Sequence, residues 1–107
     1  MIAGLARAEN DFDIRANALV CGLKQEPIEK LSKLPLLFDE ITDEHLVGFD
    51  MAGDELNYPQ EKFATLLGEI TMRGVHVTLH AGECPHCEQN VLDAVEMGAT
   101  RIGHGIM

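Results

Sequence analysis

Residues 75–80 read VHVTLH, and this short apolar segment alternates between two kinds of side chain. Successive side chains of a strand point to opposite faces, so the polar residues share one face and the aliphatic residues share the other. The polar face consists of His76, Thr78 and His80, and the aliphatic face consists of Val75, Val77 and Leu79. The pattern predicts a strand whose aliphatic face packs against helices and whose polar face ends at His80.

Three other short apolar runs are typical of strands buried in a sheet. They are NALVCGLK (17–24), LVGFD (46–50) and RIGHGIM (101–107). Together with residues 75–80 they predict four strands.

Segments with helical spacing of apolar residues lie between these strands, at residues 59–73 and 88–97. The predicted apolar stripes are Phe63, Leu66, Leu67 and Ile70 in the first helix and Val91, Leu92 and Val95 in the second. Residues 27–41 predict a third helix, which Pro35 should kink or split. Residues 2–10 predict a fourth.

The alternation of strands and helices indicates an α/β fold with a parallel sheet, either doubly wound or closed as a barrel. The positions of three reactive residues favour the barrel. Asp50, His80 and His104 each fall at the C-terminal end of a predicted strand, where barrel enzymes collect their catalytic groups.

Composition restricts the partners of the chain. With 107 residues, 46% of them hydrophobic, it can form one modest core, so we expect one domain or part of one. A formal net charge of −10 argues against a nucleic-acid polymer as partner. No apolar run has the length of a membrane span or a signal peptide. Three cysteines cannot all pair, and we expect a reducing, cytoplasmic compartment.

Four segments of the chain resemble the adenosine deaminase family of the metal-dependent amidohydrolase superfamily. They are NALVCGLK (17–24), GFDMAGDE (48–55), HAGE (80–83) and RIGHG (101–105), in this order. Related adenine-type deaminases tend to carry Ser-Ser-Glu in place of residues 52–54 and an aspartate in place of Gly103. Adenosine is therefore preferred to adenine as the expected substrate, and an adenine or aminopurine deaminase remains the alternative.

The resemblance implies a (β/α)8 barrel of which residues 1–107 are a central fragment, covering roughly strands three to six. The family's His-x-His pair on the first strand and its Asp-Asp pair on the last strand have no counterpart in this sequence. We therefore expect a partial TIM barrel that is inactive alone. Its exposed strand edges would favour self-association, and a non-catalytic interaction module is an alternative.

The resemblance also implies a reaction, the zinc-dependent hydrolysis of adenosine, and of 2′-deoxyadenosine, to inosine and ammonia. His80 would be a zinc ligand, and Glu83 would give a proton to the purine ring. His104 would orient or deprotonate the attacking water. Gly53 would donate its backbone N–H to a second purine nitrogen, where the ligand must come close to the backbone.

The segment Cys84-Pro85-His86-Cys87 has three interpretations that the sequence leaves open. It could be a thiol redox motif before a helix, an accessory metal site, or a solvent-exposed loop, which is the expected one.

Other polar residues near the motifs have more than one possible role. Asp50, Asp54 and Glu55 could shape the pocket or cap the loop that follows them. We expect His45 to be a surface residue that precedes its strand.

Overall fold

A single sheet of four parallel strands forms the centre of the fold, which is known from a computed structural model that describes residues 1–107. The strands are β1 (Ala18–Leu23), β2 (Leu46–Ala52), β3 (His76–Ala81) and β4 (Arg101–His104). They lie side by side in chain order, and every neighbouring pair is parallel. All four predicted strands are present. β2 extends two residues beyond its predicted end, and β4 stops three residues before its predicted end.

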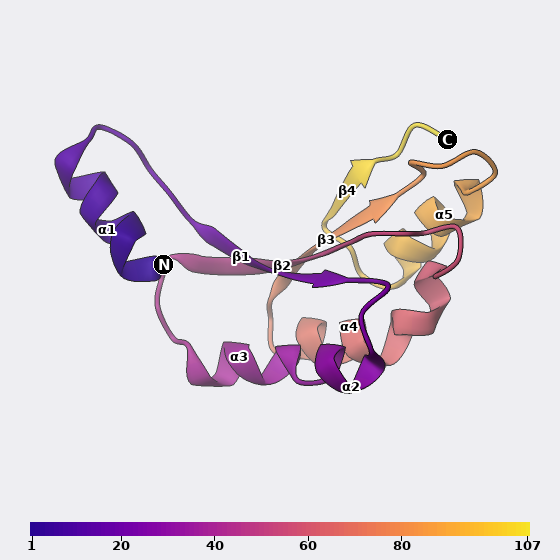
Figure 1. The fold of residues 1–107 in the computed structure, drawn as a ribbon, viewed down its shortest axis with the longest axis horizontal. Helices are drawn as coiled ribbons and strands as arrows, with labels where there is room; N and C mark the ends of the chain where they lie inside the picture. Colours follow the sequence, from indigo (N-terminus) through magenta and orange to yellow (C-terminus); the bar gives the residue numbers. More distant parts are fainter.

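Helices connect the strands on one side of the sheet. After α1 (Ile2–Asp11) and β1 come α2 (Ile28–Leu31) and α3 (Leu34–Glu40), then η1 (Gln60–Phe63), α4 (Ala64–Met72) and α5 (Glu88–Glu96). Figure 1 shows α2, α3 and α4 beneath the sheet and α5 beside β3 and β4, while the opposite face carries no helix. This arrangement is the one expected of part of a (β/α)8 barrel, with helices outside and the inner face uncovered.

Proline and glycine set the helix boundaries as the sequence indicated. The segment 27–41 is split into α2 and α3, and Pro35 occupies the first turn of α3, where a missing N–H costs nothing. The segment 59–73 begins with one turn of 3-10 helix before α4. Gly74 follows α4 with φ +73°, the left-handed conformation that ends helices and favours glycine.

The hydrophobic core lies between the outer face of the sheet and the helices. The predicted stripe of Phe63 and α4 is buried completely or nearly so. It packs against the aliphatic face of β3 and the matching face of β2, in a cluster that includes Phe49, Met51, Val77, Leu79 and Ala81. The alternation predicted for residues 75–80 is confirmed, because Val77 and Leu79 are buried whereas His76 is exposed.

The predicted apolar stripe of α5 is correct only for Val91, which packs against the core. Leu92 and Val95 are 59% and 60% exposed, and the buried residues of this helix are Asn90 and Ala94. Ala94 has a small side chain that allows α5 to approach the sheet closely. Asn90 is buried because its side-chain amide donates hydrogen bonds to Glu55. The hydrogen bonds of Asn90 therefore determine which face of α5 is buried. Hydrophobic periodicity does not reveal such a polar contact.

His45 is buried rather than at the surface, which corrects a second prediction. Its side chain is 11% exposed, with Nε2 3.0 Å from Glu9 Oε2 and Nδ1 2.9 Å from Asp43 Oδ1. These hydrogen bonds, to Glu9 first and then to Asp43, raise the pKa of His45. Because Glu9 belongs to α1 and His45 immediately precedes β2, the contact attaches the N-terminal helix to the sheet.

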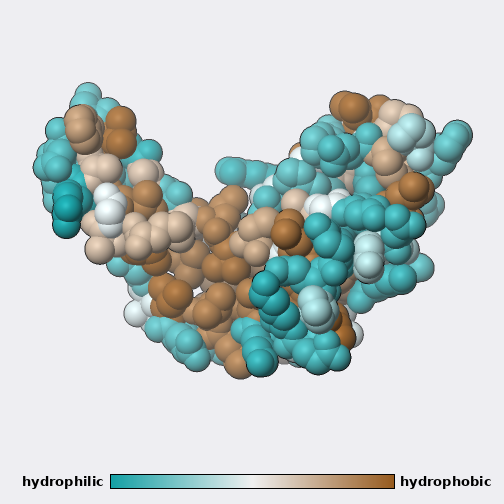
Figure 2. Space-filling view, in the orientation of Figure 1, coloured by the Kyte–Doolittle hydropathy of each residue, from teal (hydrophilic) through white to brown (hydrophobic).

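The inner face of the sheet is open. Figure 2 shows a concave outline between a lobe formed by α1 and a lobe formed by β4 and α5. Leu19, Leu23 and Val47 from β1 and β2 are each at least 40% exposed. None of the helices combines the length and the apolar character that a membrane crossing requires.

Candidate active site

Three predicted site residues converge at the C-terminal end of β3 and β4. The ring centroids of His80 and His104 lie 5.1 Å apart, and His104 Nε2 lies 3.4 Å from Glu83 Oε2. One nitrogen or oxygen atom from each of the three side chains lies within 4.8 Å of the others. The structure thus brings the two histidines together, with Glu83 beside them.

An unusual backbone conformation accompanies the position of His104. In the sheet register His80 pairs with Gly103, and His104 pairs with Ala81, which faces the core. Strict alternation would therefore place the His104 side chain on the core side, away from His80. Instead His104 has φ +70°, a conformation that costs a residue with a side chain about 1–3 kcal/mol and is concentrated at functional sites.

Gly103 leaves the room that the His80 ring occupies. A Cβ atom at Gly103 would lie 3.0–3.1 Å from three atoms of the His80 imidazole. Any larger residue there would have to displace the ring. The close approach gives a physical reason for glycine at this position.

Asp50 contacts His80 from the neighbouring strand. Its Oδ2 atom lies 3.3 Å from His80 Nε2, and its Oδ1 atom is buried without a hydrogen-bond partner. Both residues lie on the inner face of the sheet. Asp50 therefore lies beside His80 and does not cap the loop that follows β2.

The backbone of His80 is held by two buried side chains that sequence reasoning did not identify. Lys24 Nζ and Gln60 Nε2 donate to the His80 carbonyl oxygen at 3.0 and 2.9 Å. Lys24 is 1% exposed and Gln60 is fully buried. Burial lowers the pKa of the Lys24 ammonium, although the nearby Glu55, Asp54 and Glu83 carboxylates oppose this. Neither contact has a local sequence signal, because Lys24 is 56 residues from His80.

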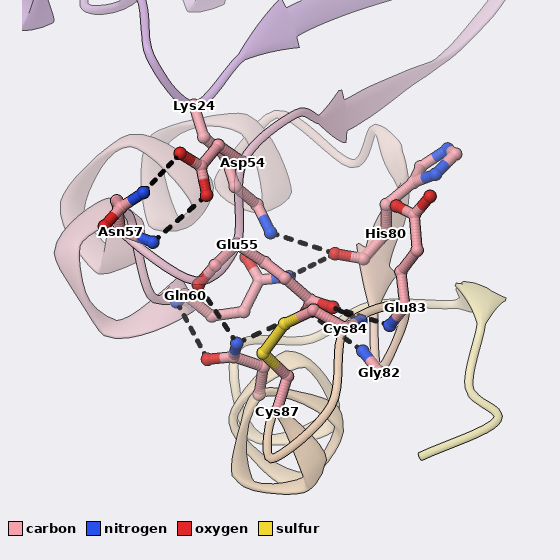
Figure 3. Close-up of a disulfide and its surroundings, with 11 residues drawn as sticks. Lys24, Asp54, Glu55, Asn57, Gln60, His80, Gly82, Glu83, Cys84 and Cys87 are labelled. Carbon is pink, nitrogen blue, oxygen red and sulfur yellow. Dashed lines mark hydrogen bonds between the residues drawn. A yellow bond between two sulfur atoms is a disulfide. The ribbon is translucent and has the colours of Figure 1, made fainter.

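Glu55 holds the loop that follows β3. Its carboxylate accepts hydrogen bonds from the backbone N–H groups of Gly82, Glu83 and Cys84 at 3.0, 2.5 and 2.9 Å (Figure 3). Burial raises the pKa of Glu55, but these hydrogen bonds outweigh it and the net pKa is lowered. The Asp54 carboxylate, in contrast, accepts hydrogen bonds from Asn57 of its own loop, and the Asp54 backbone N–H donates to the side chain of Gln25, which follows β1. Glu55 therefore holds the loop after β3, which is distant in the sequence, whereas Asp54 caps the loop in which it lies.

Gly53 lies just after β2, at the same end of the sheet as His80. Its φ of +108° favours glycine, and a Cβ atom there would collide with the side-chain oxygen of Gln25. The backbone at this point is therefore closely packed against residues that follow β1.

Cys84 and Cys87 form a disulfide, with their Cα atoms 5.6 Å apart. The expected exposed loop is correct for Pro85 and His86 but wrong for Cys87, which is 4% exposed. Cys87 is buried because it begins α5 against the loop held by Glu55.

An accessory metal site of Cys84, His86 and Cys87 is not assembled. The two cysteines lie close to the Glu55 carboxylate, and His86 is not part of this group. The sulfur atoms of that group are joined to each other, and both Glu55 oxygens already accept hydrogen bonds. Cys21 is the free cysteine, and burial raises the pKa of its thiol.

Comparison with known sequences identifies relatives along the whole chain. The family model described as "Adenosine deaminase" matches residues 1–107. An adenosine deaminase of Lactococcus lactis subsp. lactis (strain IL1403) is 78% identical over 107 residues, which are 100% of this chain and 30% of that protein. An adenosine deaminase of Enterococcus faecalis (strain ATCC 700802 / V583) is 42% identical over 106 residues, covering 99% of this chain and 31% of that protein. The chain thus spans about 30% of the length of the curated relatives it matches.

Solved structures share the fold at lower sequence identity. An amidohydrolase from Burkhoderia ambifaria with bound Zn has a TM-score of 0.91 and 23% identity, over 97% of this chain and 29% of that one. An adenine deaminase from Arthrobacter aurescens has a TM-score of 0.84 and 22% identity, over 98% of this chain and 32% of that one. At these identities the likeness concerns the fold, which is that of a partial TIM barrel. The match of the family model to every residue, with close relatives over the full chain, shows that this chain belongs to the adenosine deaminase family.

Proposed function

We propose that residues 1–107 are the central part of an adenosine deaminase catalytic domain. In the complete domain, adenosine or 2′-deoxyadenosine would be hydrolysed to inosine and ammonia. The observation that carries the proposal is the convergence of His80, Glu83 and His104 at the C-terminal end of two neighbouring parallel strands. The family membership supports the reaction, and adenosine deaminase is the activity in the names of relatives up to 78% identical.

The donor atoms of this site fit a zinc ion. Zinc favours imidazole nitrogen and carboxylate oxygen ligands, and catalytic zinc sites have three protein ligands and one open position. His80 is the proposed ligand of this chain, and the unpartnered Oδ1 atom of Asp50 leaves a further acceptor beside it. The other ligands would come from strands outside residues 1–107. When bound, zinc lowers the pKa of a water molecule towards ~7, so that hydroxide is available near neutral pH.

The side chains of this region would divide the proton transfers between them. Deamination adds water to the ring carbon that bears the amino group, so the attacking water must lose a proton and the adjacent ring nitrogen must gain one. His104 would orient this water and accept its proton, and Glu83 would donate a proton to the ring nitrogen. The 3.4 Å contact between the two side chains is compatible with both groups facing one substrate.

Gly53 would help to hold the purine. A backbone N–H can approach a flat ring closely only where no side chain intervenes. Gly53 has a positive φ and lies at the same end of the sheet as His80, which supports such a contact, and the contact would fix the orientation of the base.

The complete protein would act on a small nucleoside. We place it in the cytoplasm, where a disulfide such as Cys84–Cys87 is uncommon and would be kept reduced. The acidic charge of −10 on residues 1–107 opposes binding to a nucleic-acid polymer. In isolation, the chain would self-associate through the free edges of β1 and β4 and the exposed leucines of the inner face.

The roles of His80, Glu83 and His104 can be tested in a chimeric protein, which we call the assembled deaminase. In this protein residues 1–107 replace the matching third of the Lactococcus lactis relative, and the remaining chain of that relative supplies the rest of the barrel. Glu83→Gln should lower kcat by about 10²–10⁴-fold, because an amide cannot donate the acid proton. His80→Asn should lower the zinc content per chain, as measured by atomic emission.

Glu88→Gln is the matched control, because this exposed glutamate begins α5 and makes no contact with the site. It should retain the parent kcat. A kcat of the Glu83→Gln variant within about threefold of the parent would show that Glu83 does not donate the proton.

A further inference from the structure

The carboxylate of Glu55 is buried against the backbone of another loop. Glu55 is 5% exposed, and its two oxygens accept four hydrogen bonds. Three come from the consecutive amides of Gly82, Glu83 and Cys84, and the fourth comes from the Asn90 side chain at 3.3 Å. A buried carboxylate is costly unless its lone pairs are satisfied, so this arrangement specifies one position of the loop.

The shape of the loop explains why an anion fits there. Gly82 has φ +70°, which lets the following amides turn towards a common point. Successive amides arranged in this way form a concavity that binds an anion. Here the anion is supplied by the chain itself, from a residue 28 positions before Glu83.

The side chain of Glu83 depends on this loop for its position. It is 57% exposed, and its one ion-pair contact is to His104 at 3.4 Å. Packing around the side chain therefore does little to hold it. Its own backbone N–H, however, is bound by Glu55 at 2.5 Å. In Figure 3 the Glu83 side chain extends alongside that of His80, while its backbone lies against Glu55.

We propose that Glu55 is a positioning residue for Glu83, which acts by holding the amides of Gly82, Glu83 and Cys84. This inference rests on the proposed function, in which Glu83 is the proton donor. Glu55 itself does not touch the substrate. Its carboxylate fixes the direction in which the Glu83 side chain leaves the backbone, and misplacement of a catalytic group by ~1 Å can cost about 10²-fold in rate.

A double-mutant cycle in the assembled deaminase tests the proposal. Glu55→Gln retains the shape of the side chain but replaces one acceptor by an NH2 group, which faces backbone donors. It should lower kcat by about 10–100-fold, with KM changed less than about threefold and zinc per chain unchanged. In the Glu83→Gln background the same substitution should have little further effect, because the residue that Glu55 positions is already inactive.

Glu55→Asp, which keeps the charge but shortens the reach, should recover part of the lost kcat and provides a second variant if Glu55→Gln does not fold. Glu88→Gln is the matched control. The proposal is overturned if the effects of Glu55→Gln and Glu83→Gln multiply, or if zinc content falls in step with kcat, since Glu55 would then support the whole site. If Glu83→Gln alone has no effect, the proposed function fails instead.

Discussion

His45 shows how one buried residue makes the fold sensitive to pH. Both ring nitrogens face carboxylates, those of Glu9 and Asp43, and the pKa of His45 is raised. A raised pKa stabilises the folded state at low pH, and this contribution is lost as pH rises through the raised pKa. The pKa of Glu9 is lowered by the N–H of Ala16 and then by His45, and that of Asp43 by the N–H and ring of His45. Their contributions are lost as pH falls.

The His45 contribution to stability is lost at high pH and the two carboxylate contributions are lost at low pH. We therefore expect the largest stabilisation in a pH range between these limits. The ordinary pKa values are 4.5 for Glu9, 3.8 for Asp43 and 6.5 for His45, so all three contributions coexist between pH 4.5 and 6.5. In the assembled deaminase His45→Gln should lower the Tm most in this window, and the difference should shrink as pH rises above it. Thermal unfolding followed by circular dichroism measures this, with exposed His86→Gln as control. A Tm difference that stays constant from pH 5 to 9 would contradict the account.

Residues differ in how far the sequence reveals them. His80, Glu83 and His104 were predicted because each belongs to a short motif that resembles a family. Lys24, Gln60 and the function of Glu55 were not, because their partners are 20 to 56 residues away and the contacts depend on the packed sheet. His45 was misplaced for the same reason, since Glu9 is 36 residues from it.

Helices and strands follow the predicted hydrophobic periodicity where their packing is apolar. They depart from it where polar contacts determine which face is buried. Strand alternation and the stripe of α4 were predicted correctly, because aliphatic side chains alone determine which face is buried. In α5 a buried Asn90 determined the face. The end of β4 also departs from alternation, through the positive φ of His104. Both exceptions lie at the candidate site, where function competes with regular structure.

The loop between β3 and α5 is secured by Glu55 and by the Cys84–Cys87 disulfide. In the assembled deaminase the double substitution Cys84→Ser with Cys87→Ser should retain most adenosine turnover, because neither sulfur takes part in the proton transfers and the Glu55 hydrogen bonds go to the backbone. Steady-state kinetics with and without a dithiol reductant measure this. A loss of about 10²-fold or more would make the thiols part of the site.

At the scale of the whole molecule, the four strands present half of a barrel with its inner face open. The site residues lie at the C-terminal end of β3 and β4, as barrel enzymes require, and the side chains of Glu83 and His104 are 57% and 36% exposed. His80 is the one proposed zinc ligand of this chain, whereas a catalytic zinc site needs three protein ligands. The account therefore predicts that residues 1–107 supply necessary but insufficient groups for deamination.

The most direct test compares the isolated chain with the assembled deaminase, each given equimolar zinc. Conversion of adenosine to inosine is followed by the change in ultraviolet absorbance. The assembled protein should turn over on the order of 10 per second, as an ordinary enzyme does, and the isolated chain should be slower by more than about 10³-fold. A folded, zinc-loaded assembled protein without turnover would contradict the central claim that these residues form a working part of a deaminase. Turnover by the isolated chain within about 10³-fold of the ordinary rate would contradict the claim that residues 1–107 hold only part of the site.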